Sequence, residues 1–163
     1  MHRTSFDNAD RAILLALQSD ARVANAEIAR QLDMAPSAIL ERIKKLEQRG
    51  VIEGYSARLA PRACGFGLTA FISVGVDGAR ATPAIGPTLA AIPEVLEVHQ
   101  VVGDDCYLLK LRARDTDDLA RLLNEQIKPI RGIATTRTTI VLATAKEQST
   151  LPLPPTAAAE TGR

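Results

Sequence analysis

The sequence has few of the side chains from which metal centres, disulfide frameworks and nucleophilic active sites are built. It has no Trp, two cysteines and two histidines among 163 residues. Cys64 and Cys106 lie far apart and belong to no C-x-x-C pattern, so we expect neither a disulfide framework nor a zinc site. His2 and His99 add no cluster of ligands. We therefore expect no metal, no cofactor and no enzymatic activity.

Long apolar runs and a charge excess of one sign are also missing. No run approaches the roughly 18 apolar residues of a membrane span, and residues 1–7 contain no apolar signal core. Aromatic residues make up only 3% of the chain, so the core is aliphatic. We expect a cytoplasmic protein with reduced thiols and no membrane partner. Its 20 Lys and Arg against 19 Asp and Glu give a net charge of +1, so any binding to nucleic acid depends on local charge.

Three helices are predicted in the first fifty residues. The first begins after Asp7, a residue type that caps helices, and the second begins around the similar residue Asn25. A tight break over 33–35 precedes the third helix, which starts at Pro36 and ends before Gly50. A short helix, a tight turn and a longer helix are typical of a helix-turn-helix.

The third predicted helix has one apolar face and one basic face. At about 100° per residue, Ile39, Ile43 and Leu46 fall on one side. From residue 35 to 50, four basic side chains against two acidic ones give a net charge of +2. A helix of this kind fits the major groove of DNA, which is about 12 Å wide. The alternative is an ordinary solvated helix surface. The predicted DNA-binding residues are Pro36, Ser37, Ala38, Glu41, Arg42, Lys45 and Arg49.

The segment that follows alternates like a strand from Tyr55 to Leu59 and stops at Pro61. We interpret it either as the wing of a winged helix-turn-helix or as a linker strand that pairs with a partner subunit. From residue 148 onward, three prolines and then three alanines predict a disordered tail.

The rest of the chain predicts strands over 68–76, 95–102, 106–113 and 133–145. A helix over 82–92 and another that Asp115 caps lie between them. The resulting β-α-β-β-α-β order is that of ferredoxin-like folds, with an antiparallel sheet whose two helices cover one face. We expect oligomerisation to cover the other face. The fold class is therefore α+β, and the predicted domains are 1–53 (helix-turn-helix), 54–66 (linker strand), 67–147 (ferredoxin-like) and 148–163 (tail).

Several separated motifs resemble the Lrp/AsnC, or feast/famine, family of transcriptional regulators. They are the "D-x-x-I-L" opening at 10–14, LERIKKLE at 40–47 with GVI at 50–52 and GY at 54–55, VGDDCYLL at 102–109 and TRT at 136–138. The resemblance covers about residues 6–146. It implies a sequence-specific, double-stranded-DNA-binding regulator of amino-acid or related metabolism. It also implies dimers that assemble into octamers or related rings.

The resemblance further implies that a small effector, often an amino acid, binds at interfaces between C-terminal domains. The effector-binding residues carried over by motif are Gln100, Gly103, Asp104, Asp105, Cys106, Tyr107, Thr136 and Thr138. Many members have Asp at the position of Cys106, where it helps to hold the amino group of the effector. A thiol cannot supply that charge. Ala35 also stands where members often have a capping Ser, which costs about 1 kcal/mol.

Three other functions remain open at this stage. The chain could regulate or organise DNA without an effector, or it could bind a ligand as an oligomer and recognise no specific DNA. As an enzyme it would need Cys106 as a nucleophile, with His99 across the predicted hairpin as its base. The acidic residues 104, 105, 117 and 118 are better explained as turn and helix-start residues.

Overall fold

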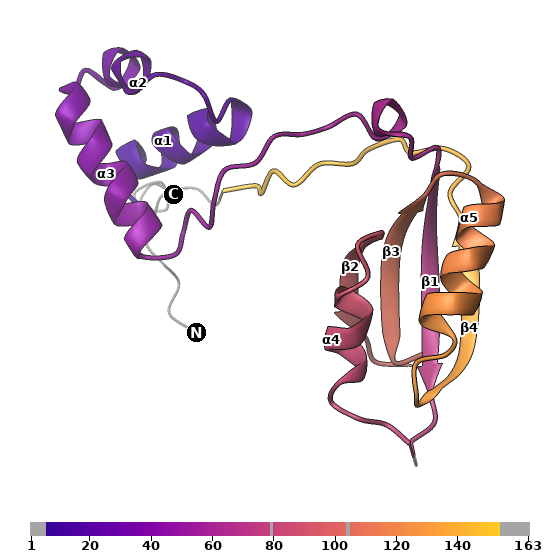
Figure 1. Cartoon of the computed structure of the whole chain (residues 1–163). Helices are drawn as coiled ribbons and strands as arrows, with labels where there is room; N and C mark the ends of the chain where they lie inside the picture. Colours follow the sequence, from indigo (N-terminus) through magenta and orange to yellow (C-terminus); the bar gives the residue numbers. More distant parts are fainter. Residues whose placement is uncertain (1–5, 79, 104, 154–163) are drawn as a thin grey trace, which may run out of the picture. The chain divides into compact units, whose positions relative to one another are not determined.

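The computed structural model describes residues 6–78, 80–103 and 105–153, which form two compact units (Figure 1). The first, the helical unit, comprises the described residues up to Arg58 and those from Glu147 onward. The other, the sheet unit, runs from Leu59 to Lys146. The predicted linker over 54–66 is thus divided between the two units.

Three helices make up the regular structure that is described in the helical unit: α1 (Asn8–Ser19), α2 (Asn25–Leu32) and α3 (Pro36–Gln48). The Asp7 carboxylate accepts the Asp10 N–H at 2.7 Å, so the predicted cap of α1 is confirmed. The predicted cap of α2 is wrong by one residue, because Ala24 is the cap and Asn25 is already helical. The buried core consists of Ile13, Leu14, Ile28, Ala29, Ile39, Ile43 and Leu46.

The break between α2 and α3 depends on one residue in the left-handed region. Asp33 has φ 52° and ψ 47°, which Asp tolerates better than most residues because its short polar side chain bonds locally. Pro36 is the first residue of α3, and Gly50 follows the helix end at φ +65°. The predicted start of the third helix is therefore confirmed, and its end lies at Gln48, one residue before the predicted Arg49.

The segment predicted as a wing or a linker strand pairs with no strand among the described residues of its own chain, so its pairing with a partner subunit stays a prediction. Residues 53–60 are extended but have no regular sheet pairing, and a short helical turn, η1 (Pro61–Cys64), follows them. An extended segment is a strand only when a neighbour satisfies its backbone in register. Within this segment the Arg58 side chain donates from Nη2 to the Glu147 carbonyl, at 3.0 Å.

The sheet unit has four antiparallel strands in the order β2-β3-β1-β4, which is the ferredoxin-like order that was predicted. Its elements are β1 (Leu68–Val76), α4 (Ile85–Ala90), β2 (Val95–Gln100), β3 (Tyr107–Ala113), α5 (Thr116–Arg121), a π-helical extension η2 (Leu122–Ile127) and β4 (Ile133–Ile140). The helix predicted over 82–92 is shorter than expected, with Pro87 in its first turn, where proline is tolerated. The predicted last strand also ends early, at Ile140.

Both helices cover the same face of this sheet (Figure 1). Ile85 and Leu89 of α4 pack with Leu119 and Leu122 of the α5 segment against the buried side chains of β1 and β3. The opposite face carries cross-strand polar contacts. Lys110 Nζ, for example, donates to Glu97 at 3.0 Å.

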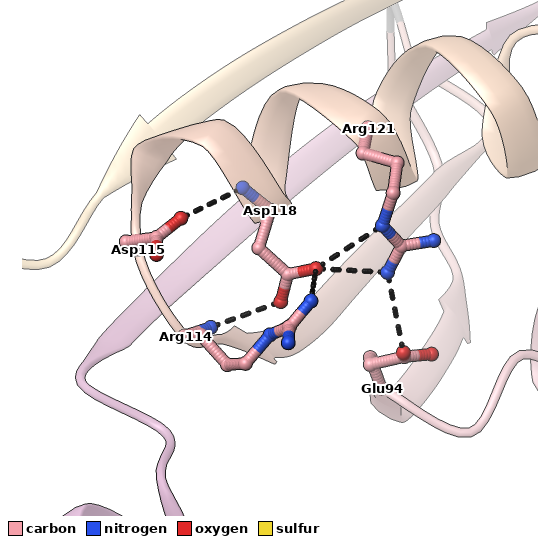
Figure 2. Close-up of polar contacts among 5 residues, drawn as sticks. All are labelled: Glu94, Arg114, Asp115, Asp118 and Arg121. Atoms are coloured by element: carbon pink, nitrogen blue, oxygen red, sulfur yellow. Dashed lines mark hydrogen bonds and ion pairs between the residues drawn. The ribbon is translucent and has the colours of Figure 1, made fainter.

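A cluster of charged residues fastens α5 to the sheet (Figure 2). The buried Asp118 carboxylate accepts the Arg114 N–H at 3.0 Å, Arg114 Nη2 at 3.1 Å and Arg121 Nη2 at 2.8 Å. Arg121 also pairs with Glu94, next to β2, at 3.6 Å. The Arg114 side chain, its N–H and Arg121 together hold the pKa of Asp118 far below its usual range. Asp115 caps the helix as predicted, accepting the Asp118 N–H.

Two kinds of feature are absent from the residues that the structure describes. No helix there is long and apolar enough to cross a membrane. No group of three or more His, Cys, Asp or Glu side chains in those same residues is placed to hold a metal ion.

Candidate DNA-binding and effector sites

The exposed face of α3 is the first candidate site. Its buried face, formed by Ile39, Ile43 and Leu46, packs on α1 and α2, so the opposite face points to solvent. Most of the residues predicted to contact DNA lie on that exposed surface: Pro36, Ser37, Glu41, Lys45 and Arg49. Ala38 and Arg42 are half-buried.

Arg42 is engaged within the helical unit. Its Nη1 donates to Asp7 Oδ2 and to Asp10 Oδ1, both at 2.7 Å. The hydrogen bond from the Asp10 N–H lowers the pKa of Asp7, and the Arg42 side chain lowers it further. The same two carboxylates raise the pKa of Arg42. This guanidinium therefore ties the middle of α3 to the start of α1 and is not a freely available cation.

Other charges on α3 differ in how far they are neutralised. Lys44 Nζ pairs with Glu41 at 3.1 Å, so this part of the surface carries little net charge. Lys45 is exposed and forms no ion pair with another residue of the described chain. Lys45 is thus the α3 cation that is best placed to meet a phosphate or a guanine edge.

The beginning of α3 also favours an anion. Its first turn contains no acidic residue, and Ala35, as predicted, makes no capping bond with its side chain. The positive end of the helix dipole and its N–H groups attract phosphate when no carboxylate occupies that end. The lost capping bond thus leaves this end of the helix available to DNA.

Tyr55 connects the segment after α3 to the helix itself. Its hydroxyl donates to Glu47 Oε1 at 2.9 Å. Partial burial raises the pKa of Tyr55, and the Glu47 carboxylate raises it further. The hydroxyl therefore stays protonated and keeps donating at neutral pH.

The second candidate site lies at the end of the sheet that carries the β2–β3 turn. The register places Gln100, Tyr107, Val74 and Thr136 in one row across all four strands. Residues directly opposite each other on paired strands share a face. The side chains of Tyr107 and Thr136 therefore lie on the helix-covered side, with buried Val74 between them. Thr138 lies in the next row, opposite Ile72.

The turn itself is held by backbone hydrogen bonds on both sides. The Cys106 N–H donates to the Val74 carbonyl at 2.9 Å, and the Cys106 carbonyl accepts the Val101 N–H at 3.0 Å. Gly103 has φ +137°, a conformation that side-chain-bearing residues rarely adopt. The predicted site residue Asp104 lies outside the described residues.

The carboxylate that could replace the acid missing at Cys106 is already paired. Asp105 Oδ2 accepts Arg137 Nη2 at 2.6 Å. An ammonium group arriving at this turn would therefore compete with a guanidinium for Asp105. Arg137, the only basic residue within β4, was not among the predicted site residues.

Helix α4 contacts this row of residues directly. At Gly86 an added Cβ would lie 3.4 Å from Cε1 of Tyr107, so the ring packs against the helix backbone. An alanine Cβ at position 86 would meet the ring at ordinary contact distance, so there is no room for a side chain that extends further towards it. The position of Tyr107 and the position of α4 thus depend on each other, a contact that the sequence pattern did not indicate.

Comparison with known proteins assigns each of the two units to a known protein family profile. The family profile described as "Winged helix-turn-helix DNA-binding" matches residues 6–53, and "Lrp/AsnC ligand binding domain" matches residues 69–151. The chain is 36% identical over 151 residues to the HTH-type transcriptional regulator FL11 of Pyrococcus horikoshii. That match covers 93% of this chain and 99% of FL11.

Solved structures agree with this assignment. Escherichia coli AsnC superposes with a TM-score of 0.85 at 32% identity, covering 91% of this chain and 100% of that one. The Neisseria meningitidis regulator NMB0573, solved as a complex with L-Met, superposes with a TM-score of 0.85 at 29% identity, covering 91% and 97%. The resemblance and the fold class inferred from the sequence are therefore confirmed, and the chain belongs to the Lrp/AsnC family of transcriptional regulators.

Proposed function

We propose that this chain binds operator DNA through the exposed face of α3, and that an amino acid bound at the Gly103 end of the sheet modulates this binding. The observation that carries the DNA-binding half is the exposed, unpaired Lys45 in the last turn of α3, on a helix whose N-terminus is free of acidic residues. Phosphate contacts from this surface give affinity, and side chains near Ser37 read base edges. We further propose that the protein acts as a cytoplasmic regulator and not as an enzyme, which its family membership supports.

A pair of lysine variants tests the DNA surface. Genomic footprinting with the wild-type protein first supplies bound fragments. On these, Lys45→Ala is expected to weaken binding by about tenfold, the equivalent of one lost contact of roughly 1.4 kcal/mol, and to lower the salt dependence. Lys128→Ala removes the same charge from the sheet unit, where Lys128 donates only to Asn124 among the contacts described. If Lys45→Ala and Lys128→Ala bind DNA equally well, α3 is not the DNA-binding surface.

The amino-acid half of the proposal depends on the chemistry of the turn. The row of Gln100, Tyr107 and Thr136 offers hydrogen-bonding groups near the Gly103 turn. The related NMB0573 was solved with L-Met, which supports an amino acid as the effector. Because Cys106 is neutral and Asp105 is paired with Arg137, the ammonium group of such an effector has no unpaired acid among the described residues of the turn.

Calorimetry against the twenty amino acids tests this directly. We expect weak binding by the wild-type protein and tighter binding by Cys106→Asp, since a carboxylate at that position supplies a partner for the ammonium. Cys64→Asp introduces the same charge at an exposed position away from the turn and serves as the control. Heat from neither the wild type nor Cys106→Asp would favour a regulator without an amino-acid effector.

We also propose that the chain works as a homodimer that assembles into an octamer or related ring. The support is the uncovered face of the sheet, where half-buried Phe71 and Leu108 lie among charged side chains. Apolar groups on a sheet face that no helix covers are typical of an interface. Light scattering across a range of concentrations measures the mass, and a monomer throughout would contradict the assembly.

A further inference from the structure

The chain returns to the helical unit after it has completed the sheet unit. The side-chain amide of Gln18, in α1, contacts both backbone groups of Leu151. Gln18 Oε1 accepts the Leu151 N–H at 2.7 Å, and Gln18 Nε2 donates to the Leu151 carbonyl at 3.2 Å. One side chain thus satisfies an N–H and a C=O of the same residue, as a neighbouring strand does.

An apolar contact accompanies this pair of hydrogen bonds. Leu153 is half-buried and packs against the core of the helical unit, together with Phe6 and Leu17. The Leu151 side chain, in contrast, is 69% exposed. The segment is therefore held by the backbone of one residue and the side chain of another.

The composition of the segment favours this docking. Leu151 and Leu153 each precede a proline in the sequence. A residue before proline is biased towards extended backbone, so the segment loses less conformational freedom when it docks than an unrestricted chain does. The same prolines led the sequence prediction to a disordered tail from residue 148. The structure instead places Leu151–Leu153 on the helical unit, while residues 154–163 lie outside the described part.

We propose that Leu151–Leu153 is a built-in ligand of α1 that stabilises the helical unit and gives it a second attachment to the sheet unit. Residues 53–60 form the first attachment, after α3, and the segment that follows β4 forms the second, at α1. Arg58 and the Glu147 carbonyl join the two attachments where they pass each other. Any change that displaces the end of the chain after β4 therefore loosens the helices as well.

The occupant of this site is the tail of the same chain. Within one chain, residues 141–150 link β4 to the docked segment, so docking is intramolecular and is favoured by a high effective concentration. A tail from a second copy could reach the same Gln18 only in an assembled particle. Hydrogen exchange in mixed assemblies of labelled and shortened chains separates these two arrangements.

Thermal unfolding of paired variants gives the first test. A chain that stops after Lys146 is expected to unfold its helical unit about 4–8 °C lower than a chain that stops after Leu153. In the full chain, Leu151→Pro removes the N–H that Gln18 accepts, whereas Leu151→Ala removes only an exposed side chain. Leu151→Pro should therefore lower the midpoint and Leu151→Ala should not. Equal midpoints within both pairs would overturn the proposal.

Hydrogen exchange measured by mass spectrometry gives the second test. The Leu151 amide is expected to exchange slowly in the wild type and in Gln31→Ala, whose side chain bonds only to Glu27 among the contacts described, but rapidly in Gln18→Ala. Isotope-labelled Gln18→Ala chains are then assembled with chains that stop after Lys146. Labelled tails that stay unprotected support docking within one chain. Regained protection would mean that the tail docks on a partner, which overturns the proposed arrangement.

Discussion

Replacing Arg42 with alanine distinguishes a DNA contact from a bond between helices. Its Nη1 binds Asp7 and Asp10 at 2.7 Å each. The Asp7 side chain is 53% exposed, so its share is less than about 1 kcal/mol. The Asp10 side chain is 13% exposed and the Arg42 side chain 31%. A hydrogen bond to a charged group contributes roughly 1.5–3 kcal/mol to stability, and we place the bond between Arg42 and Asp10 near the low end of that range.

We therefore expect Arg42→Ala to lower the free energy of unfolding of the helical unit by about 2 kcal/mol. For a unit of this size the midpoint falls by roughly 8–16 °C. Circular dichroism and calorimetry of the full chain measure this. Arg30→Ala is the matched control, because Arg30 forms only an exposed pair with Glu27 within α2, and such surface pairs contribute little to stability.

DNA binding measured on the same proteins completes the test. Arg42→Ala should weaken binding together with stability, whereas Lys45→Ala should weaken binding alone. In a double-mutant cycle, Asp10→Asn and Arg42→Ala should be non-additive, since they remove the same bond. The reasoning fails if Arg42→Ala loses DNA affinity while its unfolding midpoint stays at the wild-type value; Arg42 would then contact DNA directly.

Three further outcomes concern stability. Asp118→Asn should destabilise the sheet unit well beyond Asp117→Asn, an exposed neighbour in the same helical turn, when both are compared by urea unfolding. Gly132→Ala should lower the free energy of unfolding by more than about 1 kcal/mol, because φ is +99° and the new Cβ would lie 2.6 Å from the Arg80 carbonyl oxygen. Gly78→Ala, where the new Cβ would lie in open space, is its control. Hydrogen bonds hold the pKa values of Asp7 and Asp118 below their usual range, so their contribution is complete above about pH 4 and declines as the pH falls through the lowered values. Acid titrations of the wild type and of Asp118→Asn test this. If both lose the same stability below pH 4, the lowered pKa of Asp118 is not the cause of the loss.

Features that depend on neighbours in the sequence were predicted correctly. The apolar face of α3 follows from helical spacing, and Pro36 and Gly50 mark its ends through their own backbone preferences. The four strands and their order follow from local alternation and from the usual topology of such units. Errors at single boundaries, such as Asn25 in place of Ala24, come from neighbouring residues with similar preferences.

Features that depend on distant pairs could not be read from the sequence. Arg42 falls on the basic stripe of α3, but its partners lie 32 and 35 positions earlier, so its engagement becomes visible only after the helices pack. The bond between Gln18 and Leu151 spans 133 positions. The row that joins Tyr107 to Thr136 likewise needs the register of two strand pairs, β1 with β3 and β1 with β4. The pair of Arg137 and Asp105 spans 32 positions.

The docked segment also has a consequence for the order in which the protein is made. On the ribosome the three helices emerge first, and domains generally fold in the order of their synthesis. Leu151 and Leu153 emerge only after the entire sheet unit. The helices must therefore fold without their last stabilising contacts, and the unit that is translated first is completed last. A nascent chain that stalls within β4 then presents helices that are formed but incompletely stabilised, because Leu153 does not yet pack against their core.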